Sequence, residues 1–525
     1  MVPISSGELL ARALERVGEP FLVVDRDGSL GLVGPDGAAT GGRVVGYLPA
    51  VLPEKLGDES FRRAHGLRYA YVSGAMANGI GSVEIAQAMG RAGMLGIFGA
   101  AGLPLRQVEA AIDRLAPRSG PTLPHGFNLI HSPNDPALES AVVDLYLRRG
   151  VRLVEASAYL DLTLPVVRYR LDGIHRDASG RVVTPNRVMA KISRVEVASK
   201  FLGPPPERFV RELVTSGAIT AEQATLSTQI PMADDLTAEA DSGGHTDNQA
   251  AVVLLPTMLA LRDRLQRQHR FSEAPRVGAA GGISTPWSAA AAFAMGASYV
   301  VVGSVNQSCV ESGTSDAVRS MLAQAQQADI AMAPAADMFE MGVKVQVLKR
   351  GTMFAMRAAK LHEVYRARES IAEIPAADRA MLEKTIFKAP LETIWDQTRA
   401  YFLERDPSQV ERADRDPKHL MALVFRWYLG QSSHWANLGE PSRAVDYQVW
   451  CGPAMAAFNE WVKGSFLERA AERKVATVAM NVLYNAAVLA RARSLAAQGV
   501  PIPAGILSLA PIPLAEIEGR AVLLV

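Results

Sequence analysis

The sequence has little cysteine: two residues in 525, Cys309 and Cys451, far apart in the chain. A disulfide framework and a cysteine-based zinc site both depend on several cysteines at close spacing, so neither is expected. HExxH, GxSxG and GxxxxGK[ST] motifs are absent, and the His, Asp and Glu residues show no metal-ligand spacing. We therefore expect no metal and a reducing, cytoplasmic location.

An excess of charge of one sign is also lacking. The chain has 55 Lys and Arg residues against 54 Asp and Glu residues, a net charge of +1. This balance removes the global electrostatic case for binding nucleic acid, although a local basic patch could survive it. We expect no nucleic-acid partner.

Long apolar runs are missing as well. The most lipid-like stretch, residues 289–302, falls short of the 18 or so residues that a spanning helix needs, and Gly296 interrupts it. The N-terminus carries Glu8 and Glu15 and has no apolar run typical of a signal peptide. We expect no membrane segment.

The sequence does have enough apolar residues for a large core, because hydrophobic residues make up 49% of it. This composition excludes disorder over most of the length. The chain is too long for one ordinary domain, and its patterning indicates three zones: residues 1–60, 61–350 and 351–525. The first zone predicts a short helix over residues 8–17, followed by a β-hairpin in FLVVDRDGSLGLVG.

The second zone alternates short, continuous apolar runs with amphipathic segments, the pattern of a parallel sheet covered by helices. Eight such units in about 240 residues predict a (β/α)8 TIM barrel of the α/β class. An open doubly wound sheet is the alternative, but no GxGxxG opens a helix after the first strand. A hairpin insertion is expected around Asp177–Gly180. The expected strands are residues 68–76, 93–100, 126–132, 151–159, 187–194, 233–241, 276–282 and 299–304.

The third zone predicts a helical domain. Helical spacing begins at about Phe339, includes the segment FEMGVKVQVLKRGTMFAMRAAKLHEVYR, and continues to about residue 499. Because this domain follows the eighth strand, we expect it to cover the barrel mouth and to form part of a substrate entrance. The last 25 residues contain four prolines and are expected to form a loosely held tail.

Barrel enzymes place their active site at the carboxyl ends of the strands. Residues that end the seventh and eighth strands, Gly281, Gly282, Gly303 and Ser304, would expose backbone N–H groups and one hydroxyl to a phosphate. The alternative is that these glycines only terminate strands. The first strand ends in SGAMANG (residues 73–79), and the third contributes Asn128, whose amide both donates and accepts hydrogen bonds.

Two ionisable residues are candidates for catalysis. His245 follows a double glycine near the end of the sixth strand, where an imidazole could act as a general acid or base, or have only a structural role. Lys191 interrupts an apolar strand and needs an anionic partner, either a carboxylate such as Glu155 or a bound anion. A structural ion pair is the alternative for Lys191.

Five motifs in this order resemble the PfaD family, the trans-acting enoyl reductases of bacterial polyunsaturated fatty acid and polyketide synthases. They are GLRYAYVSGAMANGIGSVEIAQAMGRAGMLGIFGAAGL, HGFNLIHSPNDPALE, AEADSGGHTDN, GAAGGISTP and VVVGSVNQ, and the similarity extends into the segment after the barrel. That family is related to the nitronate monooxygenases and to the flavin-type enoyl reductases. One departure is that the related enzymes have EAGGH where this chain has EADSGGH, which leaves the placement of Glu239 and Asp241 open.

The resemblance implies an FMN-binding barrel that accepts hydride from NADPH and passes it to an enoyl thioester on an acyl carrier protein. It implies that Ala75, Met76 and Asn78 contact the flavin ring, and that Asn128 contacts its pyrimidine edge. Gly281, Gly282, Gly303 and Ser304 would hold the phosphate. His245 would donate a proton or a hydrogen bond to the substrate, and Lys191 would offset negative charge on the reduced flavin or on the phosphate.

Two other functions stay open. One is a nitronate monooxygenase-type flavin oxygenase, which would consume oxygen without a carrier-bound substrate. The other is a non-catalytic FMN-binding barrel that organises a synthase complex. Either a monomer or a homodimer is compatible with the sequence.

Overall fold

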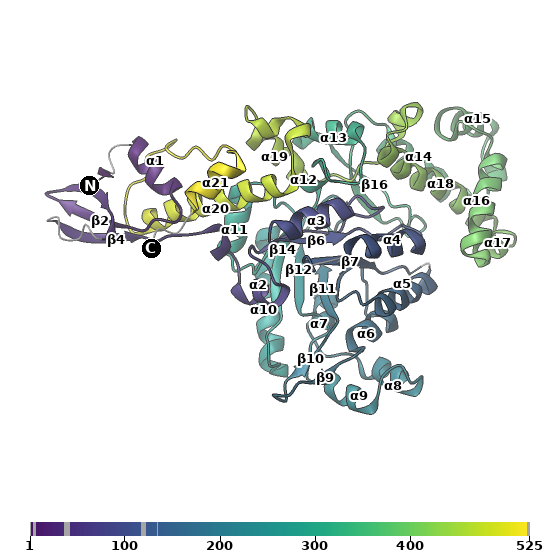
Figure 1. Ribbon diagram of the computed structural model, residues 1–525. Coiled ribbons are helices and arrows are strands. Elements are labelled where there is room, and N and C mark those ends of the chain that lie inside the picture. The colour runs from purple at the N-terminus through teal and green to yellow at the C-terminus, as the bar shows by residue number, and fades with distance from the viewer. Residues whose placement is uncertain (1, 4–6, 36–41, 117–121, 134, 522–525) are drawn as a thin grey trace.

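The computed structural model describes residues 2–3, 7–35, 42–116, 122–133 and 135–521 (Figure 1). Its centre is a closed barrel of eight parallel strands in the order β11-β12-β14-β15-β5-β6-β7-β8. The predicted TIM barrel is therefore confirmed, and the open sheet is excluded. The strands are β5 (Tyr71–Ser73), β6 (Leu95–Phe98), β7 (His125–Ile130), β8 (Leu153–Ser157), β11 (Arg187–Ile192), β12 (Asp235–Glu239), β14 (Arg276–Ala280) and β15 (Val300–Val302).

Helices cover the outer face of the barrel, and local sequence signals determine where several of them begin. Ser82 accepts a hydrogen bond from the Ile85 N–H, and Asp135 accepts one from the Leu138 N–H, so each caps the helix that follows it. The covering helices are α3 (Val83–Arg91), α4 (Leu105–Leu115), α5 (Pro136–Arg149), α6 (Leu164–Leu171), α7 (Val195–Phe201), α8 (Glu207–Thr215), α9 (Ala221–Ser227), α10 (Ala251–His269) and α11 (Pro286–Ala294). The predicted insertion is the hairpin β9 (His175–Arg176) and β10 (Val182–Val183).

Helix α2 (Glu59–His65) closes the end of the barrel at which the strands begin. Phe61 of α2 stacks on Tyr299 inside the barrel, with ring centroids 4.1 Å apart. Nearby, the fully buried Asp235 lies 2.7 Å from His65 Nε2 and accepts from Arg276 Nε at 2.6 Å. These contacts close the lower end, so the opposite end is the one where strand ends and loops can form a site.

Helix α20 (Val475–Ala497) completes the barrel wall from the far end of the sequence. The helix that directly follows β15, α12 (Ser304–Gln307), has only four residues. Instead, α20 packs against α11 and α3, which flank the position where an eighth barrel helix would lie. Sixteen of its 23 residues are buried, as expected for a helix that is apolar on all sides.

Among the helices of the described residues, α20 is the one that is long and apolar enough to cross a membrane. However, 83% of its most apolar window is buried inside the protein. It is therefore a core helix of this fold.

The N-terminal zone is joined to α20. A helix, α1 (Gly7–Glu15), precedes a sheet in the order β1-β3-β2-β4 that includes the predicted hairpin β2 (Phe21–Arg26) and β3 (Ser29–Val33). The other strands are β1 (Val2–Pro3) and β4 (Arg43–Leu48). The fully buried Arg491 of α20 donates to four backbone carbonyls in this zone, those of Ala13, Val17, Glu19 and Pro49.

The segment after the barrel differs from the helical prediction at its start. Residues Lys344–Leu348 form a strand, β17, between β16 (Ile330–Pro334) and the two-residue strand β13 (Gly244–His245). The alternation of VKVQVL fits a strand with Val345 and Val347 buried on one side. The helical prediction was wrong for these residues because the helical spacing begins only at α14 (Phe354–Ala367).

The remaining helices lie above the barrel and beyond it on the side away from the N-terminal sheet (Figure 1). A buried carboxylate, Asp446, holds several of them together by accepting from Arg357, Tyr428 and Arg443. These helices are α13 (Asp316–Ala323), α14 (Phe354–Ala367), α15 (Ala376–Leu382), α16 (Leu391–Arg405), α17 (Pro407–Ala413), α18 (Pro417–Leu438) and α19 (Pro453–Val462).

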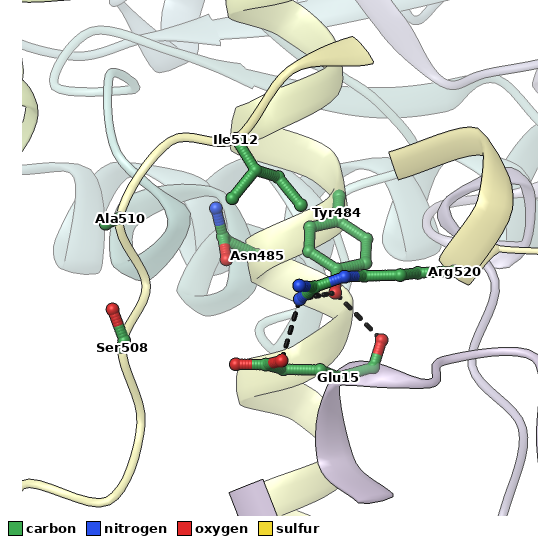
Figure 2. A pocket seen from close by; sticks show the side chains of 7 residues that line it. All are labelled: Glu15, Tyr484, Asn485, Ser508, Ala510, Ile512 and Arg520. Carbon is green, nitrogen blue, oxygen red and sulfur yellow. Dashed lines mark hydrogen bonds and ion pairs between the residues drawn. The ribbon is translucent and has the colours of Figure 1, made fainter. Parts of the chain in front are cut away.

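Up to residue 521 the C-terminal tail packs against α20, so the prediction of a loosely held tail was wrong for these residues. Asn481 of α20 donates to the Ile512 carbonyl and accepts from the Ile512 N–H, and α21 (Leu514–Arg520) follows. Figure 2 shows a cavity of about 160 Å³ beside this tail, where Arg520 pairs with Glu15 at 2.7 Å. None of its lining residues belongs to a barrel strand, so this cavity is separate from the strand ends.

Replacing Arg491 with methionine tests the link between α20 and the N-terminal zone. The change keeps most of the side-chain volume but leaves four buried carbonyls without their donor, so the free energy of unfolding should fall by about 2–4 kcal/mol. Chemical denaturation measures the effect. Arg493→Met is the matched control on the same helix, because Arg493 is exposed and should change stability by less than about 0.5 kcal/mol. Equal effects for the two variants would contradict the assignment.

Candidate functional site

The loop after β5 forms one side of the site. The Ala75 N–H donates to Glu155 Oε2 at 2.9 Å, and the Met76 carbonyl accepts from the Gly81 N–H at 2.9 Å. Asn78 adopts a left-handed backbone conformation (φ 57°), and its amide nitrogen donates to Ser433 of α18 at 3.0 Å. The side chain of Asn78 therefore ties the first barrel loop to the helices beyond the barrel.

A group of charged side chains lies inside the barrel near the strand ends. Lys191 Nζ of β11 is 3.0 Å from Glu239 Oε1 at the end of β12, and both side chains are less than one-fifth exposed. Burial lowers the pKa of Lys191, but the charges of Glu239 and Glu155 outweigh it, and the net pKa lies above its ordinary value. The direct partner of Lys191 is thus Glu239, with Glu155 acting at longer range. This geometry also settles where Glu239 lies.

Several buried polar atoms of the described residues lack a protein partner. Glu155 is fully buried, its Oε1 accepts no hydrogen bond, and burial raises its pKa despite the opposing effects of Lys191 and the Ala75 N–H. The hydroxyls of Ser73 on β5 and Ser284 after β14 are also buried without a partner. Leaving such groups unpaired is costly unless a ligand or water pairs with them. These atoms therefore indicate a polar binding site at this end of the barrel.

Asn128 on β7 belongs to the same region. It is buried, and its amide nitrogen donates to the Glu155 carbonyl at 3.1 Å and to Ser157 Oγ at 2.8 Å. These two bonds fix the amide so that the orientation of its oxygen is set in advance. Asn128 can therefore present an acceptor to a ligand N–H group.

The loops after β14 and β15 contain the four residues expected to bind phosphate, and the structure separates their roles. Gly281 (φ 80°) is required for packing, because a Cβ there would lie 2.5 Å from the Ala240 carbonyl. At Gly282 and Gly303 a Cβ would meet no atom within 4 Å, so their backbones border open space. Ser304 begins α12, and its hydroxyl accepts from the Gly452 N–H at 3.2 Å. The open backbone at Gly282 and Gly303 fits a phosphate.

His245 lies in a different element from the one predicted. The sixth barrel strand ends at Glu239, and His245 is on β13, where it pairs with Val345 of β17. Its Nε2 is 3.1 Å from Asp337 Oδ1, and the two side chains are 37% and 47% exposed. Burial lowers the pKa of His245, but the hydrogen bond and charge of Asp337, with the charge of Glu239, raise it overall. The imidazole is therefore held in its protonated form more strongly than an ordinary histidine.

The EADSGGH loop is fixed by residues that sequence reasoning did not identify. Asp241 accepts from Gln346 Nε2 of β17 and from Asn248 Nδ2, each at 2.8 Å. Gly243 packs against Gly452, where a Cβ on Gly243 would lie 2.9 Å from the Gly452 nitrogen. The alternation of residues 343–348 was a signal for β17. Asp337 and Gly452 do not belong to any recognisable sequence motif. Only the fold brings them next to His245 and Gly243.

Comparison with known proteins agrees with this geometry. Residues 63–390 match the family model described as nitronate monooxygenase, and residues 368–447 match the inserted helical domain of [acyl-carrier-protein] S-malonyltransferase. The solved enoyl reductase domain of MlnA, from the macrolactin biosynthesis cluster of Bacillus amyloliquefaciens, is 40% identical with a TM-score of 0.80. That match covers 85% of this chain and 99% of that one.

Two curated relatives are 45% identical to this chain. A polyunsaturated fatty acid synthase polypeptide of Thraustochytrium sp. matches over 476 residues, which is 89% of this chain and 32% of that relative. Polyketide biosynthesis protein PksE of Bacillus subtilis matches over 443 residues, 84% of this chain and 57% of PksE. The chain thus spans only one-third to somewhat over half of the length of these relatives.

The fold is an α/β barrel of eight parallel strands, with the candidate site at the carboxyl ends of the strands. The chain belongs to the nitronate monooxygenase family. Within that family it is PfaD-like, so the resemblance that the motifs indicate is confirmed.

Replacing Lys191 with methionine tests the buried charge group. The change leaves Glu239 and Glu155 without their cation, so the free energy of unfolding should fall by about 3 kcal/mol. The double variant Lys191→Met/Glu239→Gln should recover part of this loss. Lys200→Met is the control, because its pair with Asp161 is exposed and should contribute less than about 1 kcal/mol. Denaturant titration of the wild type and the three variants measures their free energies of unfolding. A loss of stability in Lys200→Met as large as that in Lys191→Met would contradict the prediction.

Proposed function

We propose that the protein is an FMN-dependent enoyl reductase that uses NADPH to reduce an α,β-unsaturated acyl thioester on an acyl carrier protein. The observation that carries this proposal is the match to the enoyl reductase domain of MlnA over 99% of that domain. NADPH oxidation that depends on an enoyl-loaded carrier protein tests it. A purified protein without bound flavin, or with flavin that NADPH does not reduce, would contradict it.

The residues at the strand ends fit FMN. Gly282 and Gly303 would receive the phosphate on their open backbones, with Gly281 and Ser304 shaping the loops around it. Ala75, Met76 and Asn78 would border the ring, and Asn128 would offer its amide oxygen to the pyrimidine edge. When bound, FMN supplies the hydride that it takes from NADPH.

The protein's own part of the reaction is to place charge and a proton. Reduction adds a hydride, with its two electrons, to the β-carbon of the substrate and a proton to the α-carbon. His245, whose pKa is raised by its carboxylate neighbour, would donate that proton or a hydrogen bond to the thioester oxygen. Lys191 would offset negative charge that develops in the site.

The same relatives support the proposed partner. The curated relatives are described as a fatty acid synthase component and a polyketide biosynthesis protein, which supports a synthase-borne acyl carrier protein as the partner. The match of residues 368–447 to a helical segment of an [acyl-carrier-protein] S-malonyltransferase supports the same partner. We also propose that residues 351–525 cover the substrate, that the protein forms a homodimer and that it is located in the cytoplasm.

A flavin oxygenase is the second candidate, because the family model over residues 63–390 is that of nitronate monooxygenase. Oxygen consumption with a nitronate and no carrier-bound substrate would favour it. A bound, reducible flavin with neither activity would favour a non-catalytic scaffold.

Gly303→Val tests the phosphate site. The backbone at Gly303 (φ −115°, ψ −84°) lies outside the main allowed regions for other residues, so valine adds some strain, but an added Cβ meets no protein atom within 4 Å; the variant should fold with reduced stability, which circular dichroism checks. The side chain would fill the space beside the backbone N–H and should yield colourless protein, which absorbance near 450 nm measures. Gly430→Ala, at another open position, should keep its flavin. A folded Gly303→Val protein with full FMN content would refute this placement.

His245→Ala separates the two half-reactions. The variant should retain FMN and be reduced by NADPH at the normal rate, but reduction of the enoyl thioester should slow by about 10²–10⁴-fold, the usual effect of a placed general acid. Stopped-flow absorbance follows both steps. Parallel loss of both would indicate a structural histidine, and unchanged reoxidation would remove His245 from the mechanism.

A further inference from the structure

We propose that Asp337 is the positioning residue of His245: it binds Nε2 of the imidazole and keeps the ring oriented and protonated for proton transfer. The proposal rests on the enoyl reduction proposed above, and it assigns a role to a residue outside the barrel strands. Its starting point is the 3.1 Å contact between His245 Nε2 and Asp337 Oδ1.

One strand brings the two residues together from distant parts of the sequence. Val345 of β17 pairs with His245 on one edge and with Ala333 of β16 on the other. Asp337 lies in the connection between β16 and β17, whose base is closed by the Ala335 N–H donating to the Val343 carbonyl at 2.9 Å. The histidine and the carboxylate are thus fixed to the same short sheet, so their separation does not depend on a long flexible loop.

The connection that carries Asp337 is anchored at its far side. Phe339 is fully buried and packs edge-on against Phe425 of α18, with ring centroids 6.5 Å apart. Its neighbour Glu340 accepts from Arg426 of the same helix at 3.2 Å. A carboxylate on a segment held at both ends can orient an imidazole, which a freely rotating surface aspartate would not do.

The charges around the pair favour an ion pair. His245 faces Asp337 on the β16–β17 connection, Glu239 on β12 and Lys191 on β11, and Asp337 also faces Arg426 on α18. Burial opposes ionisation of both partners, but their mutual hydrogen bond and charge raise the pKa of His245 and lower that of Asp337. The imidazolium of His245 therefore persists to a higher pH than that of an ordinary histidine.

The contact also decides which nitrogen reacts. With Nε2–H donating to Asp337, the proton on Nδ1 is the one free to transfer. In the step, the Nδ1–H bond breaks and a C–H bond forms at the α-carbon, while the hydride and its two electrons come from NADPH. Neutral His245 keeps Nε2–H on Asp337 and regains the Nδ1 proton from water.

Asp337→Asn tests the proposal in the full-length, flavin-loaded protein. The amide keeps the size of the carboxylate but removes its charge, so the pKa of His245 should fall. NMR titration of ring-labelled histidine measures that pKa directly, with His245→Gln identifying the resonance. In the pH profile of flavin reoxidation by an enoyl thioester, the alkaline limb, where protonated His245 is lost, should move to lower pH by about one unit, with a roughly tenfold slower rate at pH 8. Reduction by NADPH should not change.

Two further variants act as controls. Asp329→Asn, at the opposite end of the same hairpin, removes a carboxylate that pairs with Arg350 and should leave the pH profile unchanged. Asp337→Glu should restore most of the rate at pH 8, which a purely structural role would not predict.

The outcomes separate this inference from the proposed function. An unchanged His245 titration in Asp337→Asn, or a shifted titration with an unchanged pH profile, overturns the role of Asp337 while leaving enoyl reduction intact. If no enoyl thioester is reduced by the unmodified protein, the proposed function fails, whatever the titration shows.

Discussion

A closed barrel of parallel strands has to be covered by apolar helices all round, because its strands are buried on both faces. In this chain seven of the eight helical positions are filled by segments that alternate with the strands, and the eighth is filled by α20 from the C-terminal part. The N-terminal sheet and the C-terminal tail are in turn arranged around α20. Arg491 binds backbone carbonyls of the N-terminal zone beside this sheet, and Asn481 binds the backbone of the tail.

The site at the strand ends is correspondingly composite. The barrel supplies the open backbones of Gly282 and Gly303, the charge pair of Lys191 and Glu239, and unpaired polar atoms such as Glu155 Oε1. The segments after the barrel supply the strand that holds His245 and the carboxylate beside it. Because His245 lies on this small separate sheet, it does not occupy the end of a barrel strand itself.

Most of the barrel could be predicted from the sequence because its determinants are local. Short continuous apolar runs, glycines at strand ends and capping residues such as Ser82 each act within one unit of the fold. The site was predictable only in part. That Lys191 needs an anion follows from its apolar strand, but the choice of Glu239 over Glu155 depends on the register between β11 and β12. The strand carrying His245 is two residues long, which no periodicity can reveal, and Asp337 reaches it only through pairing of segments about 100 residues apart.

The late position of α20 has a consequence for how the protein is made. Residues 303–474 must be synthesised after β15 before α20 begins to emerge, which takes roughly 9–34 s at a translation rate of about 5–20 residues per second. During that interval the apolar surfaces of α11 and α3 that later contact α20 have no cover. A nascent chain of this protein therefore exposes an incomplete barrel wall to the ribosome surface and to chaperones, and it can complete its core only after α20 has emerged.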